Sequence, residues 1–290
     1  MDNIKKSFQF LIVGAILIAF TPVLIKAADA PGTTAVFYRF FFGSITLIIP
    51  FVFTRIKSKE TLNKKGVCIT IVAGLCIAIY MHFWATGIMI SNAAIPTLLL
   101  NLAPVWVGIG AFLLFKERQK LIFWIGLIIA FLGVSLLITQ NLMLESGMVK
   151  GLVLGFLSGV FYALFMLIAQ SGRKLLDTLS FLFISSLITT IFLGVFMCIQ
   201  GFQFTNFSTQ TWIYFIIMGV LQAGAWYLIN YAQGYLSASI VSPTLLAQPV
   251  LAAVFAFLLL GEELTVWQIT SGIIVVIGIY TVHFSKHNKR

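Results

Sequence analysis

Residues 91–117 read SNAAIPTLLLNLAPVWVGIGAFLLFKE, and residues 236–262 read LSASIVSPTLLAQPVLAAVFAFLLLGE. The second stretch begins 145 residues after the first, which is half of the 290-residue chain, and the two agree without a gap at 10 of 27 positions. An apolar alphabet raises the agreement expected by chance, but proline and glutamate are rare in this chain. The shared positions of those two types are Pro104 with Pro249 and Glu117 with Glu262. We interpret the sequence as a duplication.

The composition places this duplicated chain in a membrane. Hydrophobic residues make up 60% of it and charged residues only 9%, whereas soluble domains carry about 25% charged residues. A soluble fold would have too few polar residues to cover its surface. A bilayer core of about 30 Å needs about 20 apolar helical residues, and these runs are apolar all round, which excludes barrel strands. An all-α integral membrane protein of ten helices is predicted, at residues 8–27, 32–54, 66–87, 91–115, 121–139, 149–170, 178–200, 211–232, 236–260 and 265–284.

Half of ten helices is an odd number, so the second copy enters the membrane from the opposite side. We predict two inverted five-helix repeats, at residues 1–145 and 146–290, an architecture typical of secondary transporters. With a cytoplasmic N-terminus, 15 of the 18 Lys and Arg residues fall in cytoplasmic segments and one, Lys150, in an external connection. The positive-inside rule then puts both termini in the cytoplasm. Anionic lipid headgroups explain the net charge of +10, and no nucleic-acid partner is expected.

Short motifs occur in both copies, and those from residue 92 onward recur at matching places, whereas Ser171 and Ile184 stand at the offset from Lys26 and Arg39. The first copy has Lys26, Phe37-Tyr38-Arg39-Phe40, Asn92-Ala93-Ala94, Leu102-Ala103-Pro104 and Glu117, and the second has Ser237-Ala238-Ser239, Gln248-Pro249 and Gly261-Glu262. In this combination the sequence resembles the drug/metabolite transporter (DMT) superfamily, EamA family, over residues 8–284. The resemblance implies ten helices as two inverted five-helix repeats and the export of amino acids or related metabolites.

Arg39 is the residue whose chemistry points most directly to a substrate. It lies seven residues into the helix predicted at 32–54, about 10 Å below the interface at 1.5 Å per residue. An arginine there costs on the order of 3 kcal/mol unless it faces protein or water, and all eight Asp and Glu fall in loops or at helix ends. Either the guanidinium binds a substrate carboxylate or phosphate, with Tyr38 beside it, or it braces the backbone carbonyls of a broken helix.

Two other ionisable residues have weaker patterns. Lys26 ends the first apolar run, four residues after Pro22, and either gates the substrate path or extends its long side chain to the interface. His82 can titrate near neutral pH and couple transport to protons. The alternative for His82 is a packed, hydrogen-bonded histidine.

Paired prolines interrupt the helices predicted at 91–115 and 236–260. They are Pro96 and Pro104 in the first and Pro243 and Pro249 in the second. A proline removes a backbone donor and can kink its helix, and paired interruptions in corresponding segments point to a transport site. The polar residues expected to line that site are Thr97, Asn101, Ser239, Ser242 and Gln248. The alternative for each serine and threonine is a hydrogen bond back to its own helix.

The helix predicted at 211–232 has an aromatic and amide face. Trp226 and Asn230 are four residues apart, which places them on one side of a helix, and Tyr227 lies alongside. Such a face can receive the apolar body of a substrate while the amide orients its polar end. Aromatic residues also anchor helices at the membrane interface, which is the alternative.

The motifs that would indicate other chemistry are missing from the sequence. It has no GxxxxGK[ST] loop, no HExxH pair and no convincing Ser/His/Asp set, so no enzymatic activity, cofactor or metal is expected. We predict a secondary transporter that exports or exchanges small carboxylate-bearing metabolites, chiefly amino acids with aromatic ones among them, by alternating access across the inner membrane of a bacterium. The alternatives are efflux of multidrug or lipophilic compounds and a non-transporting channel or structural membrane protein. The oligomeric state, monomer or homodimer, stays open.

Overall fold

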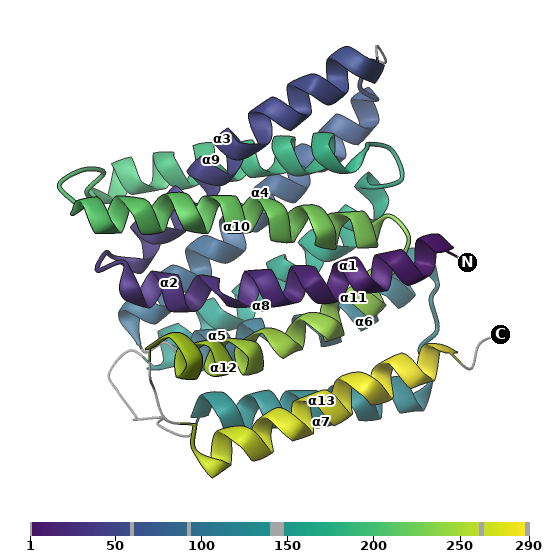
Figure 1. Cartoon of the computed structure of the whole chain (residues 1–290). Helices are drawn as coiled ribbons and strands as arrows, with labels where there is room; N and C mark the ends of the chain where they lie inside the picture. Colours follow the sequence, from purple (N-terminus) through teal and green to yellow (C-terminus); the bar gives the residue numbers. More distant parts are fainter. Residues whose placement is uncertain (1, 59–60, 92–93, 140–147, 261–263, 288–290) are drawn as a thin grey trace. The chain divides into compact units, whose positions relative to one another are not determined.

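The computed structural model describes residues 2–58, 61–91, 94–139, 148–260 and 264–287 (Figure 1). Across these ranges the secondary structure is helical, without a strand, and ten candidate spans are long and apolar enough to cross a membrane. In chain order the helices are α1 (Asp2–Ala19), α2 (Thr21–Ala27), α3 (Gly32–Ser58), α4 (Lys64–Ile90), α5 (Ala94–Leu100), α6 (Ala103–Phe115), α7 (Leu121–Thr139), α8 (Met148–Gly172), α9 (Thr178–Gln200), α10 (Thr209–Gln233), α11 (Ala238–Thr244), the 3-10 helix η1 (Leu245–Ala247), α12 (Gln248–Leu260) and α13 (Val266–His287). The predicted all-helical class and the ten spans are confirmed.

The predicted bounds match most helices to within a few residues. α7 and α9 have the bounds that were predicted, at 121–139 and 178–200. α3 continues four residues past its predicted end, to Ser58, because Arg55 and Lys57 in its last turn are good helix formers with long side chains that reach water.

One interruption was not predicted. The segment expected as a single helix at 8–27 is two helices, α1 and α2, separated by a turn at Phe20. Pro22 lies in the first turn of α2, where its missing N–H has no intrahelical partner to lose. The first span is therefore interrupted near its C-terminal end.

The chain divides into two compact units, and each unit combines two segments that are far apart in the sequence. Unit 1 contains Met1–His82 and Ile168–Leu236, and unit 2 contains Phe83–Leu167 and Ser237–Arg290. The repeat boundary predicted between residues 145 and 146 lies outside the described residues and stays a prediction.

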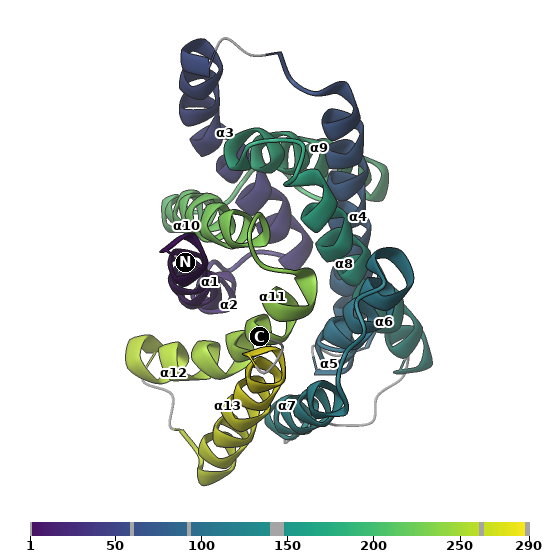
Figure 2. The same cartoon turned by 90° about the vertical axis from the view of Figure 1, so that its right-hand side faces the viewer.

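In unit 1, α10 packs against α1 and α3, and α3 also packs against α9 (Figure 2). Glycines allow the close approach of these helices. A Cβ atom added to Gly43 of α3 would lie 3.3 Å from the carbonyl oxygen of Gly219 in α10, and one added to Gly14 of α1 would lie 2.9 Å from that of Ala225. Small residues at such contacts are typical of helices that pack within a membrane.

In unit 2, α7 and α13 run alongside each other (Figures 1 and 2). A Cβ on Gly133 of α7 would lie 2.7 Å from the backbone nitrogen of Val275, and one on Gly278 of α13 would lie 2.3 Å from that of Ala130. Leu246 of η1 joins Ala130 and Val275 in one buried cluster. The contact between these two helices is therefore made largely by backbone and small side chains.

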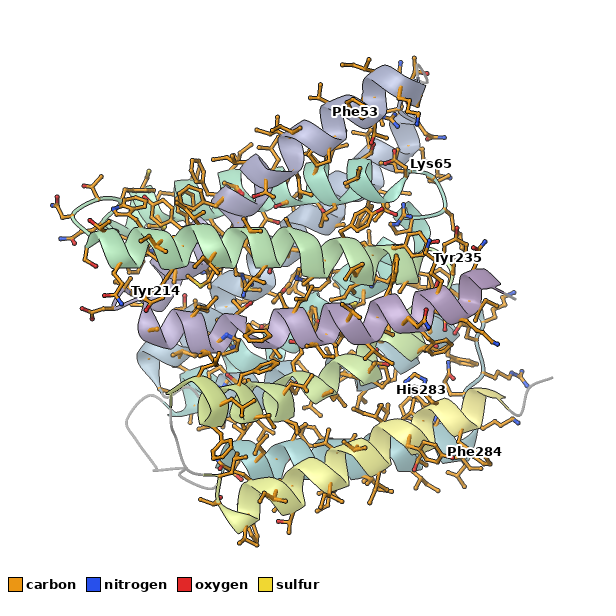
Figure 3. All side chains as sticks on the ribbon, viewed as in Figure 1. Phe53, Lys65, Tyr214, Tyr235, His283 and Phe284 are labelled. Carbon is orange, nitrogen blue, oxygen red and sulfur yellow. The ribbon has the colours of Figure 1, made fainter. Side chains whose placement is uncertain are left out.

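The outward side chains are mostly apolar (Figure 3). Phe53 of α3 is 69% exposed and Phe284 of α13 is 48% exposed, which suits contact with lipid. Tyr214 lies near one end of α10 and Tyr235 just past the other, the positions where aromatic rings meet the membrane interface. The chain is a multi-pass membrane protein.

Candidate functional site

Arg39 is buried in α3, with 7% of its surface exposed. Its Nη2 donates to the sulfur of Met81 in α4 over 3.7 Å, and its Cζ lies 5.2 Å from the centroid of the Phe40 ring. Its Nε has no hydrogen-bond partner among the described residues. A thioether is a weak acceptor, so this membrane-embedded cation retains capacity to bind an anion.

Tyr38, predicted to contact substrate beside Arg39, is held within an aromatic cluster of unit 1. Its hydroxyl donates to the carbonyl oxygen of Phe204 over 2.5 Å. Its ring stacks on Phe215 with centroids 4.7 Å apart and meets the edge of Trp212 at 4.9 Å. Ring and hydroxyl therefore fasten the segment before α10 onto α3.

A buried hydroxyl cluster between α3 and α9 was missed by the sequence analysis. The Oγ atom of Ser44 lies 2.9 Å from that of Ser186 and 3.2 Å from Oγ1 of Thr190. Thr189 donates to the carbonyl oxygen of Gly74 in α4 over 3.0 Å. The available signal was the run of hydroxyl residues at helical spacing in α9, which marks the side that meets α3 and α4.

The aromatic and amide face predicted on α10 is buried. Trp226 is 7% exposed and Asn230 is 1% exposed, whereas Tyr227 is half-buried. The Asn230 amide donates back to the carbonyl oxygen of Trp226 over 2.8 Å, and its Oδ1 has no partner among the described residues. Gln222 lies one turn before Trp226 and is 4% exposed. Its Oε1 also has no partner in the described part of the chain. The sequence analysis did not predict a role for Gln222.

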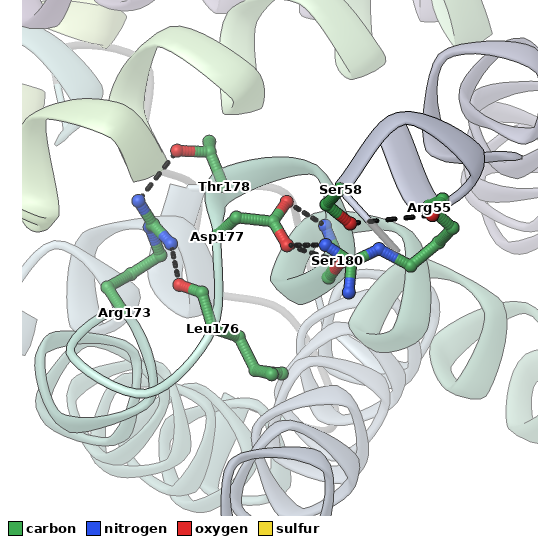
Figure 4. Close-up of polar contacts among 7 residues, drawn as sticks. All are labelled: Arg55, Ser58, Arg173, Leu176, Asp177, Thr178 and Ser180. Atoms are coloured by element: carbon green, nitrogen blue, oxygen red, sulfur yellow. Dashed lines mark hydrogen bonds and ion pairs between the residues drawn. The ribbon is translucent and has the colours of Figure 1, made fainter. Parts of the chain in front are cut away.

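Arg173, also missed, bonds within the connection between α8 and α9 (Figure 4) and to the end of α10. Its Nε donates to the carbonyl oxygen of Asn230 over 2.9 Å, its Nη1 to that of Leu176, and its Nη2 to Oγ1 of Thr178 over 2.6 Å. Burial lowers the pKa of this guanidinium, and the nearby carboxylate of Asp177 opposes that shift. Every residue has a backbone carbonyl, so the pattern of residue types cannot predict this contact.

Asp177 stabilises the start of α9 and links it to α3 (Figure 4). Its Oδ1 accepts from the Ser180 backbone N–H over 3.0 Å, which is an N-cap. Its Oδ2 lies 2.9 Å from Nη2 of Arg55 at the end of α3. These bonds fix one end of unit 1.

Unit 2 contains the two helix interruptions that the prolines predicted. α5 ends at Leu100 and α6 begins at Ala103, while α11 ends at Thr244 and α12 begins at Gln248 after η1. Ala103 and Gln248 are 145 residues apart, the offset of the sequence repeat. The interruptions therefore occur at equivalent places in the two copies.

The four prolines differ in their position at these interruptions. Pro104 and Pro249 are the second residues of α6 and α12, where a proline fits the first turn of a helix. Pro243 lies inside α11, one residue from its end, and Pro96 is the third residue of α5. Only the second proline of each pair thus follows its break directly.

The polar residues of the first interruption bond locally. The Thr97 hydroxyl accepts from the indole N–H of Trp84 over 3.0 Å, and the Asn101 amide donates to the Thr97 carbonyl oxygen over 2.7 Å. Asn101 follows α5, and this bond back to that helix competes with a role in substrate binding.

At the second interruption the polar residues differ in their surroundings. Ser242 is buried and its hydroxyl has no partner among the described residues, while Gln248 is half-buried. The Thr244 hydroxyl, at the end of α11, lies 2.9 Å from Nε2 of His283 in α13, which is labelled in Figure 3. Ser239, at the start of α11, donates to the carboxylate of Glu117 over 2.9 Å, so this hydroxyl connects α11 to the end of α6.

The two ionisable residues with weak patterns have these positions. His82 is half-buried, and its ring centroid lies 3.9 Å from that of Phe196 in an edge-on arrangement, as expected of a packed histidine. Lys26 lies in α2, but its side chain is outside the described residues.

The family follows from comparison of the sequence with known proteins. The sequence profile of the EamA-like transporter family matches residues 5–139 and again 149–284. The chain belongs to the EamA-like transporter family.

Relatives of this EamA-family chain carry matching names. It is 23% identical over 270 residues to an uncharacterized transporter of Archaeoglobus fulgidus, with 93% of each chain covered. It is 23% identical over 286 residues to the uncharacterized transporter YdfC of Bacillus subtilis, with 95% of this chain and 91% of that one covered. A solved crystal structure has the same fold, with a TM-score of 0.81 at 14% identity over 96% of this chain and 97% of that chain. The predicted family and the transporter class are confirmed.

Proposed function

We propose that this EamA-family transporter exports or exchanges small carboxylate-bearing metabolites, amino acids as a class, by alternating access between its two repeats. The observation that carries the proposal is the buried guanidinium of Arg39, whose Nη2 donates to a sulfur atom 3.7 Å away and whose Nε has no partner among the described residues. A carboxylate matches the planar fork of donors that a guanidinium presents.

In the empty transporter, the buried charge of Arg39 carries an energetic penalty. Arginine at the centre of a membrane helix costs about 2.5 to 3.5 kcal/mol on insertion scales, and an incomplete set of partners leaves part of that penalty uncompensated. A bound carboxylate supplies the missing acceptors. The same positive charge disfavours lipophilic cations as substrates.

The equivalent helix interruptions at Ala103 and Gln248 support alternating access. Discontinuous helices in matching segments of two repeats are the common site of substrate contact in secondary transporters, because the ends of the half-helices present unpaired backbone groups. A continuous channel has no need of paired breaks.

We also propose that the protein lies in the inner membrane of a bacterium with both termini in the cytoplasm. The support for this orientation is the concentration of Lys and Arg in alternate connections, with 15 of 18 on one side. Fusion of a reporter that is active only outside the cytoplasm to Arg290 tests the orientation, and an active reporter would reverse it.

The test of function is counterflow in proteoliposomes loaded with a pool of the proteinogenic L-amino acids. Wild-type protein is compared with Arg39→Ala, which removes the charge, and Arg39→Lys, which keeps the charge and loses the fork. Arg55→Lys is the matched control, because Arg55 is in the same helix and pairs with Asp177 at its end.

The expected result is saturable exchange of a subset of the pool, abolished by Arg39→Ala, reduced by Arg39→Lys and retained by the control. Exchange that survives Arg39→Ala would make this arginine a brace and overturn the carboxylate site. The absence of any amino-acid exchange in folded wild-type protein would overturn the substrate class.

A further inference from the structure

Met81 is an apolar residue, but its sulfur accepts a hydrogen bond from the buried Arg39. It is buried in α4, 8% exposed, and belongs to unit 1 with Arg39. Its sulfur lies 3.7 Å from Nη2 of the guanidinium. The Nε of the same guanidinium has no hydrogen-bond partner in the described part of the chain. A buried guanidinium is expected to have strong acceptors, and at Nη2 a thioether sulfur takes the place of one.

Two properties of methionine give this contact its meaning. A thioether is a weak acceptor, far weaker than a carboxylate or an amide oxygen. The side chain is unbranched with three rotatable bonds, and it rearranges with little penalty. The sulfur can therefore partner the guanidinium when no substrate is bound and leave it when a better acceptor arrives.

We propose that Met81 is a specificity- and affinity-determining residue, whose sulfur holds the place of the substrate carboxylate on Arg39 and is displaced by it. This inference rests on the carboxylate site of the proposed function. An amide or carboxylate at position 81 would hold the guanidinium too strongly for a substrate to displace it, and an inert side chain would leave the empty transporter less stable.

The test uses two substitutions with opposite expected effects. Met81→Gln has similar reach and places an amide oxygen where the sulfur was. A hydrogen bond to a charged group contributes about 1.5 to 3 kcal/mol, and each 1.4 kcal/mol is tenfold in affinity. We expect the half-saturating concentration of the L-amino-acid pool to rise about ten- to a hundredfold. Met81→Leu removes the acceptor at similar volume, and we expect half-saturation to stay at the wild-type value or fall a few-fold.

A second readout separates this role from packing. Without substrate, Met81→Gln should unfold at a higher temperature than wild type, because it satisfies the buried guanidinium, and Met81→Leu at a lower one. Affinity and thermal stability then change in opposite directions, which a packing defect does not produce. Met218→Gln is the control, since Met218 is fully buried in α10 of the same unit, and we expect lower stability with half-saturation within about twofold of wild type.

The outcomes distinguish the two proposals. If Arg39→Ala retains exchange, the carboxylate site fails and the role of Met81 fails with it. If Arg39→Ala abolishes exchange while both Met81 variants stay within twofold of wild type, the carboxylate site stands and the role of Met81 is overturned. A Met81→Gln protein that unfolds at a lower temperature than wild type overturns that role as well, and this arm needs no substrate.

Discussion

Replacing Gly278 of α13 with alanine is expected to destabilise unit 2, although alanine is the better helix former. The added Cβ would lie 2.3 Å from the backbone nitrogen of Ala130 and 2.6 Å from its Cα in α7. Ordinary contact begins near 3.4 Å, so the two helices must separate by about 1 Å. Neither atom belongs to a side chain that can rotate away.

The magnitude follows from two opposing effects. Glycine in a helix is less stable than alanine by about 0.5 to 1 kcal/mol, which favours the substitution. Overpacking costs about 1 to 3 kcal/mol, and a gap of 0.5 to 1 Å forfeits about a quarter to a half of each dispersion contact along the helix pair. The net expectation is a loss of about 1 to 2 kcal/mol in the free energy of unfolding.

The assay is unfolding in detergent micelles by titration with sodium dodecyl sulfate, followed by circular dichroism. The control is Gly224→Ala in α10, because a Cβ there meets no atom within 4 Å. It should raise the free energy of unfolding by up to about 1 kcal/mol. Equal effects of the two substitutions would refute the reasoning, since glycine would then act through helix propensity alone.

Three further substitutions, each with a smaller expected effect, test contacts in unit 1. Tyr38→Phe should lower the free energy of unfolding by about 1 kcal/mol, since it loses one hydrogen bond and keeps the ring packing; an altered counterflow selectivity would support the predicted contact of Tyr38 with substrate. Ser44→Ala should lower it by about 1 kcal/mol in the same titration because the hydroxyl cluster loses its α3 member, and no change would show that the cluster contributes nothing. Asp177→Ala should remove about 1 kcal/mol through the lost N-cap, while a double-mutant cycle with Arg55→Ala should give a coupling below about 1 kcal/mol because the pair is partly exposed; a larger coupling would contradict that assignment.

The membrane-spanning helices could be predicted from the length of the apolar segments. Their interruptions depend on local features such as prolines and were only partly predictable. The ten helices follow from the length of apolar segment that a bilayer requires, and α7 and α9 match their predictions to the residue. Pro104 and Pro249 correctly marked two interruptions, because a proline after a break has a fixed preference for the first turn of a helix. The break at Phe20 has only Pro22 as a signal, and that signal alone does not distinguish a kinked helix from a divided one.

The candidate site was predictable only where a residue is costly at its position. Arg39 could be predicted as a site residue because a cation in an apolar membrane helix is costly and is usually kept for a function. The predicted substrate contact of Tyr38 rests on its position next to Arg39 and stays a prediction, while its packing against Trp212 and Phe215 could not be predicted because those rings are far away in sequence. Arg173 bonds chiefly to backbone carbonyls, which every residue possesses, so no pattern of residue types could reveal it.

The pairing of α7 with α13 has a consequence for the order of synthesis. Between Thr139 and Val266 lie 126 residues, which take about 6 to 25 seconds to translate at about 5 to 20 residues per second. During that interval α7 lacks its partner, and the face that contains Gly126 and Gly133 is not yet covered by α13. Lipid or the insertion machinery must shield that face, and a nascent chain that stops before α13 leaves an early helix without its partner.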